Sequence, residues 1–289
     1  MLGLLLLYLA QPAVPEPPDA AAIMAQVAAS VERSTDARRA YVYRQLVRSS
    51  LVRSSGQVSR KEKREYQVFP GEKSTEKKLT SFTGQYRKGK EMIDYSEPGY
   101  KYKDLDVDAD LIKELTDDLV NDKESRDGIP HQLFPLAAKR LGAYSFSMKG
   151  QTEYKGRKVY QIEFEPKRKV SCVEIGSDSE GDCDEAWKGE AWIDEQELQP
   201  VRIDTHLAFK IPWGVRFFLG TNVQQMGFSI LYDRVAENVW FPVSCGTEFR
   251  FNVLWGYKRT VTLSLESSGF QKADASSTIE YDLKAAAGH

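Results

Sequence analysis

The clearest pattern in the chain is an alternation of apolar and polar residues between Trp187 and Leu207. Odd-numbered positions up to Ile193 carry apolar or small side chains, and so do odd-numbered positions from Val201 onward. The polar stretch Asp194–Gln199 separates the two series. Alternation with a period of two on both sides of a polar turn predicts an antiparallel hairpin with one buried face.

The same alternation recurs between Tyr41 and Glu266. It predicts further strands over residues 41–53, 58–69, 79–86, 92–95, 144–149, 159–165, 228–232, 249–255 and 261–265. Turn residues such as Gly56 and Pro70-Gly71 separate several of these segments. The sequence therefore predicts an α+β chain that is mostly β, built on an antiparallel sheet.

A helix is predicted at the start of this region. Asp19 is a suitable N-cap, and Ile23, Val27 and Val31 recur with a spacing of four residues. We expect this helix to end near Asp36.

Two more helices are predicted in the middle of the chain. Asp108 is the expected cap of the first, whose apolar face is formed by Leu111, Ile112, Leu115 and Leu119. The second is expected over Gln132–Leu141, where Gly142 would end it.

The N-terminal residues 1–18 are interpreted as a secretory signal segment followed by a Pro-rich linker. The apolar run Leu2–Ala10 is much shorter than the roughly 20 residues that span a bilayer. No Lys or Arg precedes this run, so an apolar tail that is not removed is the alternative. We expect export, one domain over residues 19–270, and a loosely ordered tail over 271–289.

Composition is that of a globular protein, with 41% hydrophobic and 28% charged residues and a net charge of −2. The charge is unevenly distributed, because Arg44 to Lys103 carries 15 basic against 7 acidic residues. Such a segment suits anionic lipid headgroups or nucleic acid, or simply forms the solvent face of strands. The solvent face is the favoured interpretation, and no nucleic-acid partner is predicted.

The cysteines fit an oxidising compartment. Cys172 and Cys183 flank a polar insertion, and a bridge between them would contribute about 3 kcal/mol in the chain-entropy model. Cys245 lies within a strand pattern and is expected to be buried. The same insertion carries alternating carboxylates, for which solvated loop charge is favoured over calcium binding: Asp178, Glu180, Asp182 and Asp184. No metal or cofactor is predicted.

The sequence contains no recognisable catalytic motif. The neutral-pH bases are limited to His131, His206 and the terminal His289. His206 falls beside Asp204 on a polar strand face, where a surface pair is expected. We therefore predict that the protein is not an enzyme.

Phe209–Leu219 departs from the alternation. It is apolar and aromatic, but Pro212 and Gly214 interrupt it, and a central strand rarely contains both. Two interpretations are equally supported, a loop packed on the core and a flap over a hydrophobic groove.

Three segments resemble the outer-membrane lipoprotein-sorting superfamily, the LolA-like proteins of the bacterial cell envelope. They are GRKVYQIEFEP at Gly156–Pro166, GEAWIDEQELQPVRID at Gly189–Asp204 and YDRVAENVWFPVSCGTEFRF at Tyr232–Phe251. The resemblance implies a strongly curved antiparallel sheet, an unclosed half-barrel, whose concave face is covered by the N-terminal and mid-chain helices. It also implies a location in the periplasm.

A curved sheet with one apolar face and few helices leaves a concave apolar groove. We therefore expect a monomer that binds lipid or lipoprotein acyl chains in this groove and acts in lipid or lipoprotein trafficking, with peripheral membrane contact and an envelope protein as further partners. A non-catalytic envelope sensor or interaction scaffold is the alternative. The candidate groove residues, for which ordinary core packing is the competing interpretation, are Trp192, Phe209, Trp213, Phe217, Phe218, Phe249 and Trp255.

Overall fold

The computed structural model describes residues 19–71, 75–121, 125, 127–129, 136–167, 187–208, 221–225, 227–253 and 257–273. The strands are β1 (Tyr41–Arg53), β2 (Val58–Phe69), β3 (Glu76–Lys88), β4 (Glu91–Tyr95), β5 (Tyr144–Tyr154), β6 (Arg157–Pro166), β7 (Trp187–Asp194), β8 (Pro200–Leu207), β9 (Thr221–Gln225), β10 (Gly227–Ala236), β11 (Val239–Val253) and β12 (Tyr257–Lys272).

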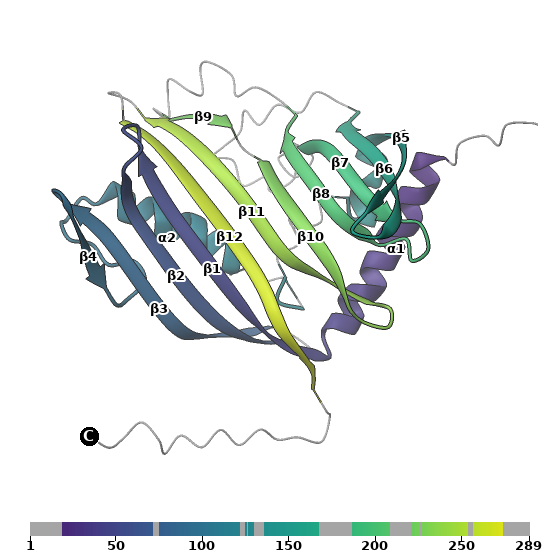
Figure 1. Ribbon diagram of the computed structural model, residues 1–289, viewed down its shortest axis with the longest axis horizontal. Helices are drawn as coiled ribbons and strands as arrows, with labels where there is room; N and C mark the ends of the chain where they lie inside the picture. Colours follow the sequence, from purple (N-terminus) through teal and green to yellow (C-terminus); the bar gives the residue numbers. More distant parts are fainter. Residues whose placement is uncertain are drawn as a thin grey trace, which may run out of the picture.

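These strands form one antiparallel sheet in the order β4-β3-β2-β1-β12-β11-β10-β8-β7-β6-β5, with β9 paired to β11. The first and last strands meet near the middle of the sheet, where Leu46 of β1 lies opposite Glu266 of β12. The sheet is twisted and curved, and its edges β4 and β5 do not pair with each other in the described residues (Figure 1). The predicted fold class, a mostly β chain with an unclosed antiparallel sheet, is confirmed.

The helices α1 (Ala20–Arg38) and α2 (Val107–Val120) lie on the same side of the sheet (Figure 1). We call this side the inner face. Along β1 it receives the buried residues Tyr43, Val47 and Leu51, whereas the exposed residues Arg44 and Arg48 point to the outer face. Among the described residues, neither helix is long and apolar enough to cross a bilayer.

Helix α1 forms as predicted. The Asp19 carboxylate accepts a hydrogen bond from the backbone N–H of Ala21 at 3.0 Å, which satisfies one of the free donors at the helix start. Its apolar face, including Met24 and Val27, is fully buried in the large core cluster beside β11 and β5. The helix continues to Arg38, two residues beyond the expected end.

Helix α2 begins two residues earlier than predicted, because its cap is Asp106 and not Asp108. The carboxylate of Asp106 accepts a hydrogen bond from the N–H of Ala109. Asp108 instead contacts the sheet, where it binds Ser59 and Arg259. Both aspartates fit the sequence rule for a cap, and tertiary contacts decide between them.

The helix predicted over Gln132–Leu141 is not confirmed as an α-helix. In its described part the chain forms the 3₁₀ helix η2 (Ala138–Ala143), which continues through Gly142. Residues 130–135 lie outside the described part of the chain.

The hairpin predicted at Trp187–Leu207 is confirmed as β7 and β8, and Pro200 is the first residue of the returning strand. The Asp194 carboxylate organises the turn by accepting hydrogen bonds from the N–H groups of Gln196 and Glu197. Gly189 is required because a Cβ there would lie 1.9 Å from the carbonyl oxygen of Asp204.

Candidate functional site

The structure describes two of the seven predicted groove residues. Phe249 lies on β11 opposite Val261 and packs, half-buried, against the apolar cluster beneath α2. Trp192 lies on β7 between the buried residues Ala191 and Ile193, so its ring points to the opposite face. There it lies 5.1 Å from the Arg202 guanidinium.

The other predicted groove residues, and the predicted cysteine bridge, lie outside the described residues: Phe209, Trp213, Phe217, Phe218, Trp255, Cys172 and Cys183.

The apolar contact between α2 and the sheet is small. Ile112 packs against Leu51 of β1 and against Val261 and Leu263 of β12, forming a cluster that is separate from the main core. Partly buried side chains surround it: Leu111, Leu115, Leu119 and Phe249. Besides this cluster, α2 contributes Val120 to the main core, so hydrophobic contacts hold the helix over a limited area.

Charged contacts make up much of the remaining attachment of α2. Asp117 accepts a hydrogen bond from Arg64 of β2 at 2.7 Å, and Asp106 accepts one from Arg60 at the same distance. Both guanidinium groups are almost completely buried, and each is satisfied by carboxylates. Because a buried charge without a partner is unfavourable, these pairs fix the position at which α2 crosses the sheet.

Beneath these pairs lies a network centred on Glu62. Its carboxylate accepts hydrogen bonds from Arg64 and from the hydroxyl of Tyr95, the latter at 2.6 Å. Burial and the charge of Glu62 raise the pKa of Tyr95 well above its ordinary value, so the phenol stays protonated and donates. The Arg60 guanidinium lies 4.9 Å from the Tyr95 ring.

Asp117 remains ionised within this arrangement. Burial acts to raise its pKa, but hydrogen bonds from Lys113 and Arg64 outweigh that effect and lower the pKa below its ordinary value of 3.8. The attachment of α2 through Asp117 is therefore electrostatic at neutral pH.

Four buried side chains with an unpaired polar atom lie on the inner face of β1 and β12 and on the facing side of α2. The unpaired atoms are the Gln45 side-chain oxygen and the hydroxyls of Ser49, Ser267 and Thr116, none of which has a hydrogen-bond partner in the described part of the protein. All four residues are at most 6% exposed. We call these four side chains the polar strip. The alternation pattern missed it, because Ser and Gln at these positions resemble solvent-facing residues.

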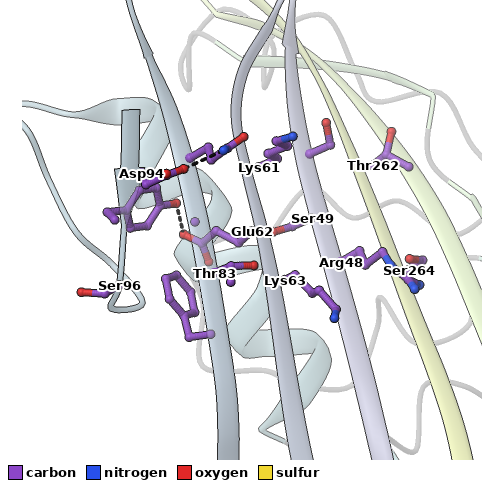
Figure 2. Close-up of a pocket in the computed structure, with 15 residues that line it drawn as sticks. Arg48, Ser49, Lys61, Glu62, Lys63, Thr83, Asp94, Ser96, Thr262 and Ser264 are labelled. Carbon is purple, nitrogen blue, oxygen red and sulfur yellow. Dashed lines mark hydrogen bonds between the residues drawn. The ribbon is translucent and has the colours of Figure 1, made fainter. Parts of the chain in front are cut away.

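The outer face carries a hollow of about 890 Å³ across β12, β1, β2, β3 and β4, which we call the outer trough. Figure 2 shows the residues that line it. One row of directly opposed residues contains Ser264, Arg48, Lys63 and Thr83, and the next contains Thr262, Ser50, Lys61, Gln85 and Asp94.

Cations and hydroxyls dominate these rows. Arg48 pairs with Glu266 and Lys63 pairs with Glu65, and all four side chains are about half exposed. Exposed pairs of this kind are weak and exchangeable, so the cations of the trough can also pair with anionic groups of a ligand. In the sequence, the cations of the outer trough are indicated by the excess of basic residues between Arg44 and Lys103.

His206 lies in a second, smaller hollow of about 250 Å³ on the outer face. It is exposed on β8, opposite Lys188 of β7, and Glu163, Glu190 and Asp204 line the same hollow. The Asp204 carboxylate pairs with Arg202 at 2.7 Å and does not hydrogen-bond His206 in the described residues.

Three solved structures illustrate the proteins to which this chain is similar. A DUF1329 family protein from Desulfovibrio piger is 11% identical over 90% of this chain and 95% of that one, with a TM-score of 0.37. An outer membrane lipoprotein-sorting protein domain from Vibrio parahaemolyticus is 9% identical over 88% and 95%, with a TM-score of 0.36. A LolA superfamily protein from Nitrosomonas europaea is 10% identical over 86% and 94%, with a TM-score of 0.33.

The superfamily that the sequence resembles is thus among these structural neighbours. At such identities and TM-scores, the likeness supports no conclusion about what this chain does. No family model matches the sequence, and no curated protein matches it.

Proposed function

We propose that this protein binds a hydrophobic ligand, lipid or lipoprotein acyl chains, on the inner face beneath α2, and that it catalyses no reaction. The observation that carries the proposal is the way α2 is attached. A small apolar cluster lies under the helix, while ion pairs with Arg60, Arg64 and Arg259 hold it in place. Such a helix can separate from the sheet with limited disturbance of the main core, to which it contributes only Val120 and the partly buried Leu119.

Separation of α2 would expose an apolar patch on the sheet. Leu51, Val261 and Leu263 would be uncovered on the sheet, next to Phe249. An acyl chain gains about 0.8 kcal/mol for each methylene that it buries there. The loss of translational and rotational freedom offsets part of this gain, which leaves an affinity suited to a reversible carrier.

The remaining predicted groove residues belong to the same proposal. Trp255 follows Phe249 along the chain, and the aromatic stretch Phe209–Leu219 supplies further candidate contacts. Trp192 is left out, because its ring packs near Arg202 on the opposite face of the sheet.

We also propose that the protein is exported to the periplasm and acts in lipid or lipoprotein trafficking. The apolar run Leu2–Ala10 and the two cysteines of the polar insertion support export. Peripheral membrane contact is supported by the segment before α2. Four large apolar side chains are exposed in the described residues, and three of them lie here: Tyr102 and Leu105 in this segment and Val107 at the start of α2. Leu105 is 75% exposed.

The test has two parts. Lipids are extracted from the purified protein and identified, and binding of the fluorescent acyl analogue 1-N-phenylnaphthylamine is measured. Asp117→Asn weakens the contact between α2 and Arg64, while Arg64 keeps Glu62 as its partner. We expect the probe to bind about fivefold faster, corresponding to about 1 kcal/mol of weaker attachment.

Asp110→Asn is the matched control, because Asp110 pairs with the exposed Lys101 in the segment before α2 and not with the sheet. Equal rates for both variants would show that α2 does not control access. Absence of both lipid and probe binding would refute the proposal, and a stable complex with an envelope protein in that case would support the alternative, an interaction scaffold.

A further inference from the structure

The polar strip lies on the inner face of β1 and β12, where the buried Val47 separates Gln45 from Ser49. Gln45 and Ser267 lie directly opposite each other on β1 and β12, and Ser49 follows Gln45 by four residues on the same face of β1. At about 3.3 Å per residue, the strip extends for about 13 Å along the sheet. Thr116 faces it from α2, one helical turn after Ile112.

Each atom of the strip is buried without a partner among the described residues. Buried polar groups are nearly always hydrogen-bonded, because leaving one unpaired loses its hydration without compensation. Four such groups on one face, of which Ser49 and Thr116 lie where α2 crosses the sheet, indicate a surface that is completed by something other than this fold.

The chemistry of the strip limits what completes it. The Gln45 side-chain nitrogen donates to the carbonyl of Gly128 at 3.3 Å, which fixes the orientation of the amide. The oxygen of Gln45 is therefore an acceptor that requires a donor. The three hydroxyls can donate or accept, and the four side chains carry no charge.

We propose that the polar strip binds the neutral linkage group of the amphiphile, and that this group must carry a hydrogen-bond donor, a hydroxyl or an amide N–H, adjacent to the acyl chain. This inference rests on the proposed function, since separation of α2 uncovers Ser49 and Thr116, whereas Gln45 becomes accessible only when the loop at Gly128, to which it is hydrogen-bonded, moves as well. The acyl chain would then lie along Leu51, Val261 and Leu263, beside Ser49.

The test compares two ligands with the same oleoyl chain, monoolein and methyl oleate, as competitors of the fluorescent acyl probe. Both carry an ester, but only monoolein has hydroxyl donors. We expect monoolein to bind about tenfold more tightly, the effect of about one satisfied buried hydrogen bond. Gln45→Met should remove most of this preference.

Ser49→Ala and Ser267→Ala give a second, independent readout. We expect each to reduce the preference for monoolein, while thermal stability stays equal or rises, because an unpaired buried hydroxyl has been removed. Ser50→Ala is the matched control, since Ser50 is the chain neighbour of Ser49 and points to the outer face. It should change neither property.

The outcomes separate the two proposals. Equal binding of monoolein and methyl oleate would overturn the role of the strip and leave acyl binding intact. A clear loss of stability in Ser49→Ala and Ser267→Ala would also overturn it, because the hydroxyls would then be bonded within the fold. Failure of both ligands to bind would refute the proposed function itself.

Discussion

Individual residues fix the inner face mainly through buried charge. The Arg38 guanidinium at the end of α1 pairs with Asp127 at 2.7 Å, and both side chains are almost fully buried. The other carboxylate oxygen of Asp127 accepts hydrogen bonds from Ser125 and from the N–H of Ile129. A single aspartate therefore connects a helix end to a loop that is distant in sequence.

Asp127→Ala should lower the free energy of unfolding by about 3–5 kcal/mol, because Arg38 would be left as a buried charge without its carboxylate. Urea unfolding measures this change. Lys149→Met breaks the exposed pair with Glu163 and should change stability by less than about 1 kcal/mol. Similar losses in the two variants would contradict the account of Arg38.

At the scale of elements, the alternation of apolar and polar residues predicted most strands of the sheet. The alternation around Trp187–Leu207 predicted β7 and β8 with the correct faces, and the strand predicted over residues 58–69 is β2. This succeeded because a strand with one buried face must repeat every two residues.

The errors occurred where tertiary contacts choose between equivalent local signals. Asp106 and Asp108 are both good caps, and the choice depends on Ser59 and Arg259, which no local pattern connects to α2. The polar strip and the buried partners of Arg60 and Arg64 were not foreseen for the same reason. Charged and polar residues on a strand normally predict solvent, and only the crossing of α2 buries them.

Gly189→Ala should disrupt the β7–β8 hairpin, because the added Cβ would meet the backbone carbonyl of Asp204, which has no room to move within the sheet. We expect a loss of about 1–3 kcal/mol from the resulting backbone shift, measured by thermal or urea unfolding. Gly246→Ala on β11 is the control, since a Cβ there meets nothing within 4 Å. Equal stability of the two variants would contradict the close approach of Gly189 to the Asp204 carbonyl.

The attachment of α2 should weaken in acid. A carboxyl whose pKa is lower in the folded state stabilises the fold above its unfolded pKa, and that contribution is lost as the pH falls through the folded value. For Asp117 the loss therefore develops as the pH falls through the ordinary value of 3.8 toward the lower pKa of the folded state. Asp118 acts in the opposite direction, because burial and the charge of Asp117 raise its pKa.

The measurement is the free energy of unfolding at about pH 7 and about pH 3 for the wild type and Asp117→Asn. The wild type should lose more stability than the variant between these two values. Asp110→Asn should behave as the wild type does, and an Asp117→Asn variant with an unchanged acid loss would contradict this role of Asp117.

At the scale of the whole molecule, the two faces of one open sheet differ in chemistry. The inner face combines an apolar core under α1 with a thin apolar cluster and ion pairs under α2. The outer face carries the outer trough, with the cations Arg48, Lys61 and Lys63 in adjacent rows. Because hydrocarbon prefers the first environment and anionic groups the second, a bound acyl chain should distinguish the faces.

The most direct test of acyl binding on the inner face is photo-crosslinking with a diazirine-bearing fatty acyl probe. The labelled peptides are then mapped by mass spectrometry. We expect labels on Leu51, Val261, Leu263 and Ile112, and more labelling in Asp117→Asn than in the wild type. Labels confined to the outer trough, around Arg48 and Lys61, would contradict acyl binding on the inner face.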